Sequence, residues 1–325
     1  MLKTEMLALL EENKGEFVKG QVLADRLSVT RSAVWKAVML LREDGYNIKA
    51  VTNKGYCLEE SSDILSAQSI MPFLKGAAKD FRLDIRKSLP STNTELKRLA
   101  ADGEKEGLVL IANEQTAGRG RMGRSFFSPA DSGIYMSLLL RPNTQSNTAV
   151  LLTSLVAVSV ARAIEQVSRI KVGIKWVNDL FCGNKKLVGI LTEGGIDMES
   201  GMLEYAVVGI GVNVFTHAFP DEIKGIASSV SASLEGDSTH FSRSLLAAQI
   251  LNQIAADLPM LESRAHIAEY KARSVLIGRD IYVLKKGVQI PAVALDIDDN
   301  ASLVVRYEDR STETLFSNEV SIKQK

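Results

Sequence analysis

The sequence predicts an α+β protein built from three domains. The chain has 325 residues, a length typical of two or three domains. Apolar residues recur with helical spacing near the N-terminus, with mixed strand and helix patterns in the middle, and in short strand-like runs near the C-terminus. Hydrophobic residues make up 46% of the chain and charged residues 24%, which is usual for a globular protein. We place the domains at residues 1–62, 66–272 and 273–325.

The first domain has a helix-turn-helix pattern. Apolar residues line two successive helical faces: Val22, Leu23, Leu27 and then Val34, Val38, Leu41. Thr30 stands between the two helices, where it can cap the second one. Segments 47–52 and 54–58 flank an Asn-Lys-Gly turn and resemble two short strands. The pattern therefore predicts a winged helix-turn-helix domain.

Charge is distributed unevenly in this domain. Residues 1–60 hold nine basic and nine acidic residues, whereas Arg26–Lys54 hold six basic and two acidic ones, a net charge of +4. Such local asymmetry favours phosphate binding. The candidate DNA contacts are four residues near the start of the second helix, off its apolar face: Arg31, Ser32, Trp35 and Lys36. The alternative is a winged helix that contacts other proteins and has a solvated basic face.

The middle domain mixes strand and helix patterns. Strand-like runs occupy Arg82–Lys87, Leu108–Ala112, Ile134–Leu140, Ile174–Val177, Leu187–Thr192 and Tyr205–Val214. Helical patterns occupy Asn93–Asp102, Thr148–Arg169 and Ser242–Arg264. Because strands and helices do not alternate strictly, we expect a mixed sheet with helices packed on it, and not a doubly wound parallel sheet.

The last domain reads as short strands separated by polar turns. The runs are Asp280–Leu284, Gln289–Ile297, Leu303–Tyr307 and Glu313–Phe316. This spacing is typical of a small antiparallel barrel or sandwich.

Composition limits the other classes of protein that the chain could represent. The net charge is zero, so attraction to nucleic acid must be local. Two cysteines and three histidines show neither disulfide nor metal-ligand spacing. The N-terminus does not resemble a signal peptide, and the longest apolar stretch, about 13 residues, is too short to span a bilayer. We therefore expect a cytoplasmic protein without a membrane partner.

The stretch AGRGRMGRS, residues 117–125, fits two phosphate-binding patterns in its letters. Gly118, Gly120 and Gly123 fit G-x-G-x-x-G, and the same stretch nearly fits G-x-x-x-x-G-K-[ST]. Both patterns work only where the loop opens directly into a helix. Here the loop is followed by Phe-Phe-Ser-Pro-Ala-Asp-Ser-Gly and then a strand, so we reject both interpretations.

The loop still carries three permanent charges on Arg119, Arg121 and Arg124. The planar arginine side chain suits carboxylates and phosphates, and the glycines let the backbone fold around an anion. We expect a loop that is mobile when empty and ordered when an anionic ligand binds. Taken alone, the stretch could also be a flexible, solvated basic loop.

Three further stretches accompany the loop: LPSTNTELKRL (89–99), IKWVNDLFCGNKKLVGILTEG (174–194) and VVGIGVNV (207–214). Together with NEQTAGRGRMGRSFFSP they resemble the biotin–protein ligases, and the three-part layout resembles the bifunctional members that also repress the biotin operon. The resemblance covers nearly the whole chain. It implies a class II synthetase-like or lipoate-ligase-like central domain and a small SH3-like barrel at the C-terminus.

The resemblance also implies a reaction and its partners. Biotin and ATP, with Mg²⁺, would give biotinoyl-AMP, and a lysine of a biotin carboxyl carrier protein, an acetyl-CoA carboxylase subunit, would receive the biotin. Operator DNA and a second copy of the chain would be the other partners, with a homodimer forming when the adenylate binds.

Family residues carry over to this sequence by position. The biotin contacts match Ser91, Thr92, Asn93 and Gln115, and the loop over biotin and the adenylate matches Gly118, Arg119, Gly120, Arg121 and Arg124. The nucleotide side matches Lys175, Asn178, Asp179 and Lys186, with Asp179 near Mg²⁺. Lys186 and Arg121 are the candidate catalytic residues. Val177 stands where many relatives have proline, and Phe126 stands at a position often held by tryptophan.

Each of these stretches has a plainer interpretation when it stands alone. Ser91 could simply cap a helix, and Lys186 could be a solvated lysine beside a turn. At the level of the whole chain, the alternatives are a ligase with an idle N-terminal domain, a regulator that only senses biotin, and a lipoate–protein ligase. The joint pattern, and the arginine loop in particular, favours a biotin ligase that is also a repressor.

Overall fold

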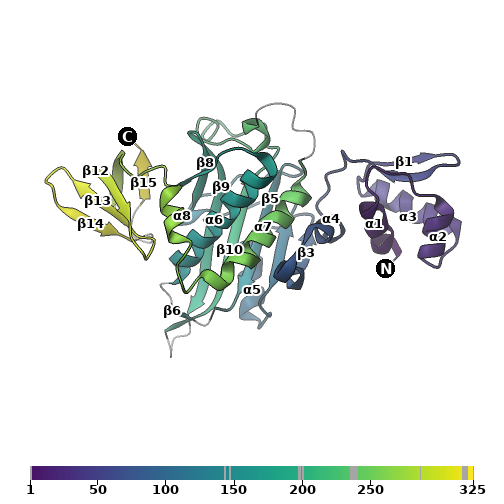
Figure 1. The fold of residues 1–325 in the computed structure, drawn as a ribbon, viewed down its shortest axis with the longest axis horizontal. Helices are drawn as coiled ribbons and strands as arrows, with labels where there is room; N and C mark the ends of the chain where they lie inside the picture. Colours follow the sequence, from purple (N-terminus) through teal and green to yellow (C-terminus); the bar gives the residue numbers. More distant parts are fainter. Residues whose placement is uncertain are drawn as a thin grey trace. The chain divides into compact units, whose positions relative to one another are not determined.

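The computed structural model describes residues 2–142, 144–145, 148–196, 199, 201–234, 241–285, 287–316 and 321–324. The chain forms two compact units (Figure 1). The first contains Met1–Leu74 and His240–Gln249, and the second contains Lys75–Thr239 and Ile250–Lys325. The predicted α+β class is confirmed.

The first unit begins with a winged helix-turn-helix, as predicted. It contains α1 (Leu2–Glu12), α2 (Gly20–Arg26), α3 (Arg31–Glu43) and the antiparallel wing of β1 (Ile48–Val51) and β2 (Gly55–Leu58). The buried core includes Met6, Leu10, Leu23, Val34, Val38, Leu41 and Leu58. The prediction for Val22 is wrong, because its side chain is 41% exposed. Ala24 takes the buried place beside Leu23.

Local hydrogen bonds fix the start of α3 and the link that follows the wing. The Thr30 hydroxyl accepts a hydrogen bond from the Ala33 amide at 3.2 Å, so Thr30 caps α3 as expected. After the wing come α4 (Ala67–Ile70) and a short helical turn, Met71–Phe73. The Arg243 side chain is almost fully buried, and its Nε donates to Asp63 Oδ2 at 2.8 Å. This ion pair fastens the link to the first turn of α7 (Arg243–Asp257).

The second unit is built on the predicted mixed sheet. In spatial order its strands are β3 (Arg82–Arg86), β4 (Leu108–Ala112), β5 (Gly133–Leu140), β10 (Met202–Asn213), β9 (Lys185–Ile196), β8 (Asp179–Cys182) and β7 (Gly173–Lys175). β3 and β4 pair in parallel, and the other neighbours are antiparallel. A two-residue strand, β6 (Thr144–Gln145), also pairs with β10. Short helical turns lie at Gly76–Asp80, Arg121–Gly123, Ser231–Ser233 and Leu258–Met260.

Helices cover both faces of this sheet, α6 (Thr148–Ser168) on one face and α5 (Thr92–Ala101) on the other (Figure 1). On the α6 face, the Thr153 hydroxyl donates to the Thr192 hydroxyl at 2.7 Å. The neighbouring residues on β9 point to the α5 face, because side chains alternate along a strand. Leu96 of α5 packs there against Leu110, Leu139 and Val207. Helix α5 therefore packs on the face of the sheet opposite to α6.

Helix α6 is long and apolar enough to cross a membrane by length and composition alone. Most of its length is buried, which is typical of a core helix. The prediction of one helix over 242–264 is wrong at its C-terminal end. Helix α7 ends at Asp257 because Pro259 cannot continue it, and a separate helix, α8 (Ile267–Ala272), follows.

The C-terminal strands form an antiparallel sheet in the order β14 (Thr312–Leu315), β13 (Leu303–Tyr307), β12 (Val288–Ile297), β11 (Asp280–Lys285) and β15 (Ser321–Gln324). The first four match the predicted runs to within two residues. Its buried side includes Ile281, Val283, Ala294, Val305 and Leu315. Closure of this sheet into a barrel stays a prediction.

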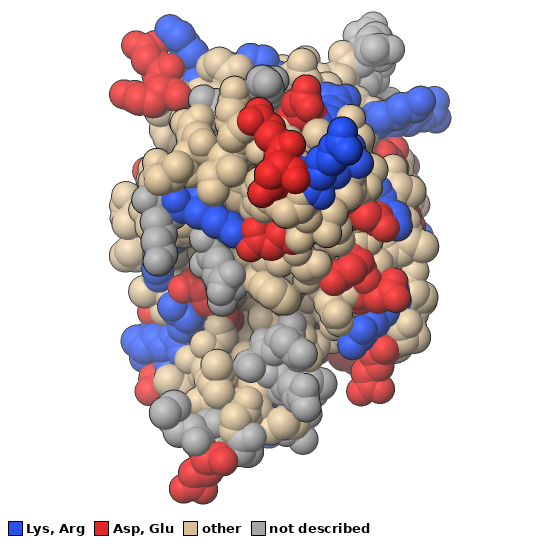
Figure 2. All heavy atoms as spheres, turned by 90° about the vertical axis from the view of Figure 1, so that its left-hand side faces the viewer, with Lys and Arg blue, Asp and Glu red and all other residues tan. Residues whose placement is uncertain are grey.

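The surface carries charges of both signs. Figure 2 shows one face of the molecule, on which lysines and arginines lie among aspartates and glutamates with uncharged surface between them. This mixture agrees with the net charge of zero. Charge asymmetry that matters for binding is therefore local.

Acid is expected to destabilise the fold through His266, which is buried and whose Nε2 lies 2.9 Å from the Ser154 hydroxyl. Burial lowers the pKa of His266 below its usual 6.5. Below that value the unfolded chain binds a proton that the folded chain does not, so stability is lost as the pH falls. Urea unfolding at about pH 7.5 and about pH 5.5 measures this loss.

We expect His266→Gln to lose less stability on acidification than the unaltered protein does. His217→Gln, at an exposed histidine, is the matched control and should behave like the unaltered chain. Equal acid sensitivity of all three proteins would contradict the role of His266.

Candidate active site

A cleft that is partly open to solvent lies on the α5 face of the sheet. Its walls come from the start of α5, the arginine loop, the turn between β7 and β8, and strands β5, β9 and β10. Twelve residues expected from the sequence line it: Ser91, Thr92, Asn93, Gln115, Arg119, Gly120, Arg121, Arg124, Lys175, Asn178, Asp179 and Lys186. Segments up to 95 residues apart in the chain therefore meet in one place.

Gly118 is the one expected residue that does not line the cleft. It lies at the base of the loop, where its carbonyl accepts a hydrogen bond from the Phe126 amide at 2.9 Å. A Cβ on Gly118 would lie 2.4 Å from the Phe126 carbonyl oxygen. Because Gly118 has no side chain, the two ends of the loop can pack closely together.

One end of the cleft is an uncharged hydrogen-bond network. Ser91 caps α5, its hydroxyl accepting from the Thr94 amide at 3.4 Å, and the same residue lines the cleft. Gln115 Oε1 accepts hydrogen bonds from the Thr92 amide at 2.9 Å and from the Thr92 hydroxyl at 3.1 Å. Gln115 Nε2 donates to the Ser128 hydroxyl at 3.0 Å. These bonds hold the polar groups in fixed orientations.

Ser137 on β5 joins this network, although we did not predict it as a site residue. The side chain is fully buried, and its hydroxyl lies 2.6 Å from Asn93 Oδ1 and 2.7 Å from the Thr92 hydroxyl. A serine that faces α5 from a run of apolar strand residues is a signal that could have identified it. Ser137 fixes the orientation of the Asn93 amide.

Glu193 on β9 links the uncharged network to the arginine loop. Its carboxylate accepts from Asn93 Nδ2 at 3.0 Å and from Lys97 Nζ at 2.6 Å, and Arg119 lies 3.5 Å away. Burial alone would raise the pKa of Glu193, but the hydrogen bonds from Lys97 and Asn93 and the charge of Arg119 outweigh it and hold the pKa below its usual value. The side chain therefore stays charged and holds the loop's first arginine.

Glycines let the helix and the loop approach the sheet closely. A Cβ on Gly209 would lie 2.1 Å from Asn93 Oδ1, and a Cβ on Gly211 would lie 2.5 Å from the Phe126 ring. Phe126 in turn meets Tyr135 edge to face, with ring centroids 6.5 Å apart. The result is an apolar floor and wall beside the polar network.

The arginine loop folds back on itself. The Gly120 amide donates to the Arg124 carbonyl at 2.7 Å, and Arg119 forms a bridge with Ser125. No helix follows the loop, and the next regular element is β5. The structural contexts of the dinucleotide and phosphate-loop patterns are therefore missing, as expected. Whether the loop is mobile without ligand stays a prediction.

The other end of the cleft is cationic. Arg121 donates to Asn178 Oδ1 at 3.3 Å, while Asn178 Nδ2 donates to the Ile190 carbonyl at 2.6 Å. Lys186 Nζ lies 2.7 Å from Asp179 Oδ1. The turn between β7 and β8 is thus tied both to the loop and to β9.

Burial and mutual repulsion destabilise the charged form of these groups. Burial lowers the pKa of Lys175, with Lys186 and Arg124 adding to the effect and Asp179 opposing it. Burial also lowers the pKa of Arg121, again against the charge of Asp179. Among the described lining residues, five cations face one carboxylate. The arrangement favours an anionic ligand with several oxygens.

The expected DNA contacts gather on α3, in the first unit. Arg31, Ser32, Trp35 and Lys36 are all exposed, and Trp35 is 54% exposed. Because all four side chains are exposed, the face of α3 that carries them is accessible to a partner.

We expect Gly209→Ala to destabilise the protein by about 1–3 kcal/mol, because the new methyl group would overlap Asn93 and force it off Ser137. Urea denaturation measures the change. Gly225→Ala is the matched control, since its Cβ would meet no described atom within 4 Å. Equal stability of the two variants would show that Asn93 is not held against the sheet.

Two segments match known family models. Residues 85–213 match the Biotin/lipoate A/B protein ligase family, and residues 3–57 match an HTH domain. The chain is 39% identical over 232 residues to the bifunctional ligase/repressor BirA of Bacillus subtilis, covering 71% of each chain. It is 28% identical over 323 residues to BirA of Escherichia coli, covering 98% of this chain and 96% of that one.

A solved structure agrees with this assignment. The biotin protein ligase from Aquifex aeolicus, in complex with biotin and ATP, has a TM-score of 0.65 at 26% identity. The similarity covers 75% of this chain and 99% of that chain. By its cleft, its helix-turn-helix domain and its identity to these relatives, the chain belongs to the biotin protein ligases, in the group of bifunctional ligase/repressors.

Proposed function

We propose that the protein joins biotin to a lysine of a biotin carboxyl carrier protein in two steps, and that it also represses transcription. The biotin carboxylate first attacks the α-phosphorus of ATP, forming biotinoyl-AMP and releasing pyrophosphate. The lysine amine then attacks the acyl carbon, forming an amide and releasing AMP. One observation carries the proposal: a cleft with an uncharged polar end beside an apolar wall and a cationic end.

The uncharged end suits biotin. Biotin has a compact apolar ring system with a polar ureido group, and a pocket for it needs few, well-placed donors and acceptors. Ser91, Thr92, Asn93 and Gln115 supply these groups in a network that Ser137 fixes. Phe126 supplies the apolar wall. Lipoate, the alternative substrate in this fold family, has no ureido group to satisfy them.

The cationic end suits the adenylation step. Bringing a carboxylate to a triphosphate places negative charges together, and fixed cations must offset that repulsion and the charge that builds in the transition state. We assign Lys186 and Arg121 this role, with Arg119, Arg124 and Lys175 around them. The mixed anhydride is reactive toward water, so a loop that covers it also protects it.

Mg²⁺ fits the cleft as a companion of the nucleotide. Asp179 is the one carboxylate among the described lining residues, and one or two carboxylates together with phosphate oxygens are typical Mg²⁺ ligands. We infer that Mg²⁺ enters with ATP and that Asp179 helps to hold it. When bound, the ion would neutralise charge on the phosphates.

Lys186→Met should reduce adenylate formation about 10²–10³-fold, because it removes a cation from the transition state. Pyrophosphate exchange into ATP measures the first step, and mass spectrometry of a carrier domain incubated with ATP, Mg²⁺ and biotin measures the whole reaction. Lys185→Met is the matched control, since the exposed Lys185 points to the Gly225 carbonyl.

A carrier domain that gains no biotin with the unaltered protein would refute ligase activity. Biotin binding without pyrophosphate exchange would instead favour a regulator that only senses biotin. The presence of Lys186 and Arg121 in the cleft speaks against that alternative.

We propose that the first unit binds operator DNA through the exposed face of α3. Arg31 and Lys36 would contact phosphates, and Ser32 and Trp35 would lie near base edges. A single winged helix reads one half-site, so repression at a palindrome requires two copies of the chain. We propose that adenylate binding orders the arginine loop and favours a homodimer. Both the carrier protein and DNA would be met in the cytoplasm, where we place the protein.

Replacing Arg31 and Lys36 together with alanine should weaken DNA binding and reduce the slope of log affinity against log salt by about 2, because each lost phosphate contact removes about one counterion. Gel-shift titration at several salt concentrations measures both. Lys3→Ala is the matched control, since Lys3 pairs with Asp44 in the same unit.

The same titration, repeated with biotin and ATP present, tests the switch. Equal DNA binding with and without the two substrates would refute adenylate-dependent repression. A protein with full ligase activity and no DNA binding would be a ligase whose N-terminal domain is idle.

A further inference from the structure

The turn between β7 and β8 carries four of the cleft residues, Lys175, Trp176, Asn178 and Asp179, but has little sheet pairing of its own. Strand β7 has three residues and lies at the edge of the sheet. Its pairing with β8 ends at Lys175 and Asp179, so the residues between them lie outside the ladder. Asn178 bonds one end of the turn to Ile190 of β9, and further contacts are needed to hold Trp176 and Val177.

Two buried hydrogen bonds hold the turn from outside the sheet. The Tyr270 hydroxyl, on α8, donates to the Val177 carbonyl at 2.8 Å, and Tyr270 is fully buried. The Trp176 Nε1 donates to the Ala301 carbonyl at 2.8 Å, in the turn before β13. Burial raises the pKa of Tyr270 far above its usual value, so its hydroxyl remains a donor.

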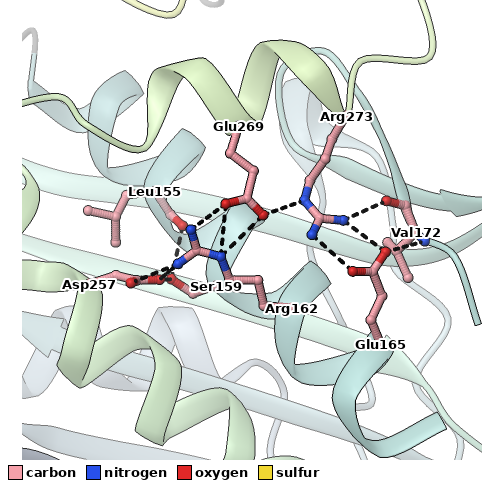
Figure 3. Close-up of polar contacts among 8 residues, drawn as sticks. All are labelled: Leu155, Ser159, Arg162, Glu165, Val172, Asp257, Glu269 and Arg273. Atoms are coloured by element: carbon pink, nitrogen blue, oxygen red, sulfur yellow. Dashed lines mark hydrogen bonds and ion pairs between the residues drawn. The ribbon is translucent and has the colours of Figure 1, made fainter. Parts of the chain in front are cut away.

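Helix α8 is itself fixed against α6 by a chain of ion pairs that alternate in sign (Figure 3). Arg162 Nε lies 2.9 Å from Glu269 Oε2, and Arg273 Nε lies 2.8 Å from Glu269 Oε1. Arg273 also makes two bonds, of 2.8 and 2.9 Å, to the Glu165 carboxylate. The last member of this series of ion pairs is Asp257, whose Oδ1 lies 3.0 Å from Arg162 Nη1.

The central carboxylate of this network, Glu269, stays charged to a lower pH than an ordinary glutamate. Burial alone would raise the pKa of Glu269, but hydrogen bonds from Arg162 and Arg273 outweigh it and hold the pKa below its usual value. The six-residue helix is too short to be stable by itself, so this network determines where α8 lies.

The backbone after α8 runs beside β7. The Ile174 amide donates to the Arg273 carbonyl at 2.8 Å, and the Val275 amide donates to the Ile174 carbonyl at 2.9 Å. The same segment that anchors the ion pairs therefore also anchors the strand that leads into the turn. The ion pairs with α6 therefore hold α8 in place, and Tyr270 on α8 in turn holds the Val177 carbonyl.

We propose that Tyr270 is a positioning residue for the nucleotide: by holding the Val177 carbonyl, it sets where Lys175 and Asn178 meet ATP. Asn178 receives the Arg121 hydrogen bond, so the position of the turn also sets where Arg121 lies. The biotin network at Ser91, Thr92 and Gln115 makes no hydrogen bond to this turn among the described residues. The proposal rests on the proposed adenylation reaction.

Tyr270→Phe removes the hydroxyl and keeps the ring. We expect the KM for ATP in pyrophosphate exchange to rise about tenfold at saturating biotin, because a buried carbonyl loses its partner and the turn shifts. The affinity for biotin alone, measured by calorimetry without ATP, should change less than about twofold, since the polar network is untouched. Tyr282→Phe, at a partly buried tyrosine on β11, is the matched control.

A purely structural role would lower the amount of active enzyme and therefore kcat, with both substrate affinities unchanged. A fall in kcat alone would overturn the proposal. So would an unchanged KM for ATP, or an equal loss of affinity for ATP and for biotin. Failure of the proposed function is distinguishable, because the unaltered protein would then show no pyrophosphate exchange.

Discussion

Five cationic side chains converge on a cleft whose described lining includes one carboxylate, and the rest of the site depends on this imbalance of charge. Burial lowers the pKa of both Lys175 and Arg121, and repulsion from neighbouring cations adds to this cost of keeping them charged. The fold must hold these groups together against their repulsion. An anionic nucleotide would be attracted by these cations, and the attraction would be strongest where negative charge accumulates on the reacting phosphate.

Rigid packing around the cleft supplies the necessary restraint. Gly209 and Gly211 have no side chains on this face of the sheet, so Asn93 and Phe126 can pack directly against the strand backbone. Glu193 and Asn178 hold the loop from two sides through Arg119 and Arg121. The polar network and the cations thus lie over the same part of the sheet.

Much of this architecture was predictable because it is local in sequence. Thr30 caps α3 through a hydrogen bond three residues away, and short, almost continuous apolar runs mark β4 and β5. The motif residues were also predictable as a set, although a capping serine such as Ser91 has no special appearance alone. The end of α7 was predicted too late, because the apolar pattern continues past Pro259.

The remaining features depend on contacts between distant segments. Ser137 acts through Asn93, 44 residues away, and Tyr270 acts through Val177, 93 residues away. Ser137 is marked only as a polar residue within an apolar strand, and Tyr270 has no local pattern that distinguishes it from an ordinary buried residue. Glu193 likewise gains its role only where α5 and the loop meet β9.

A crystal structure of the protein with biotinoyl-AMP would show directly whether the arginine loop covers the adenylate. We predict that Arg119 and Arg121 lie within hydrogen-bond distance of the acyl phosphate. We also predict the biotin ring beside Thr92, Gln115 and Phe126, and Lys186 near the reacting oxygens. A structure in which residues 118–124 point into solvent, away from both biotin and adenosine, would contradict these predictions.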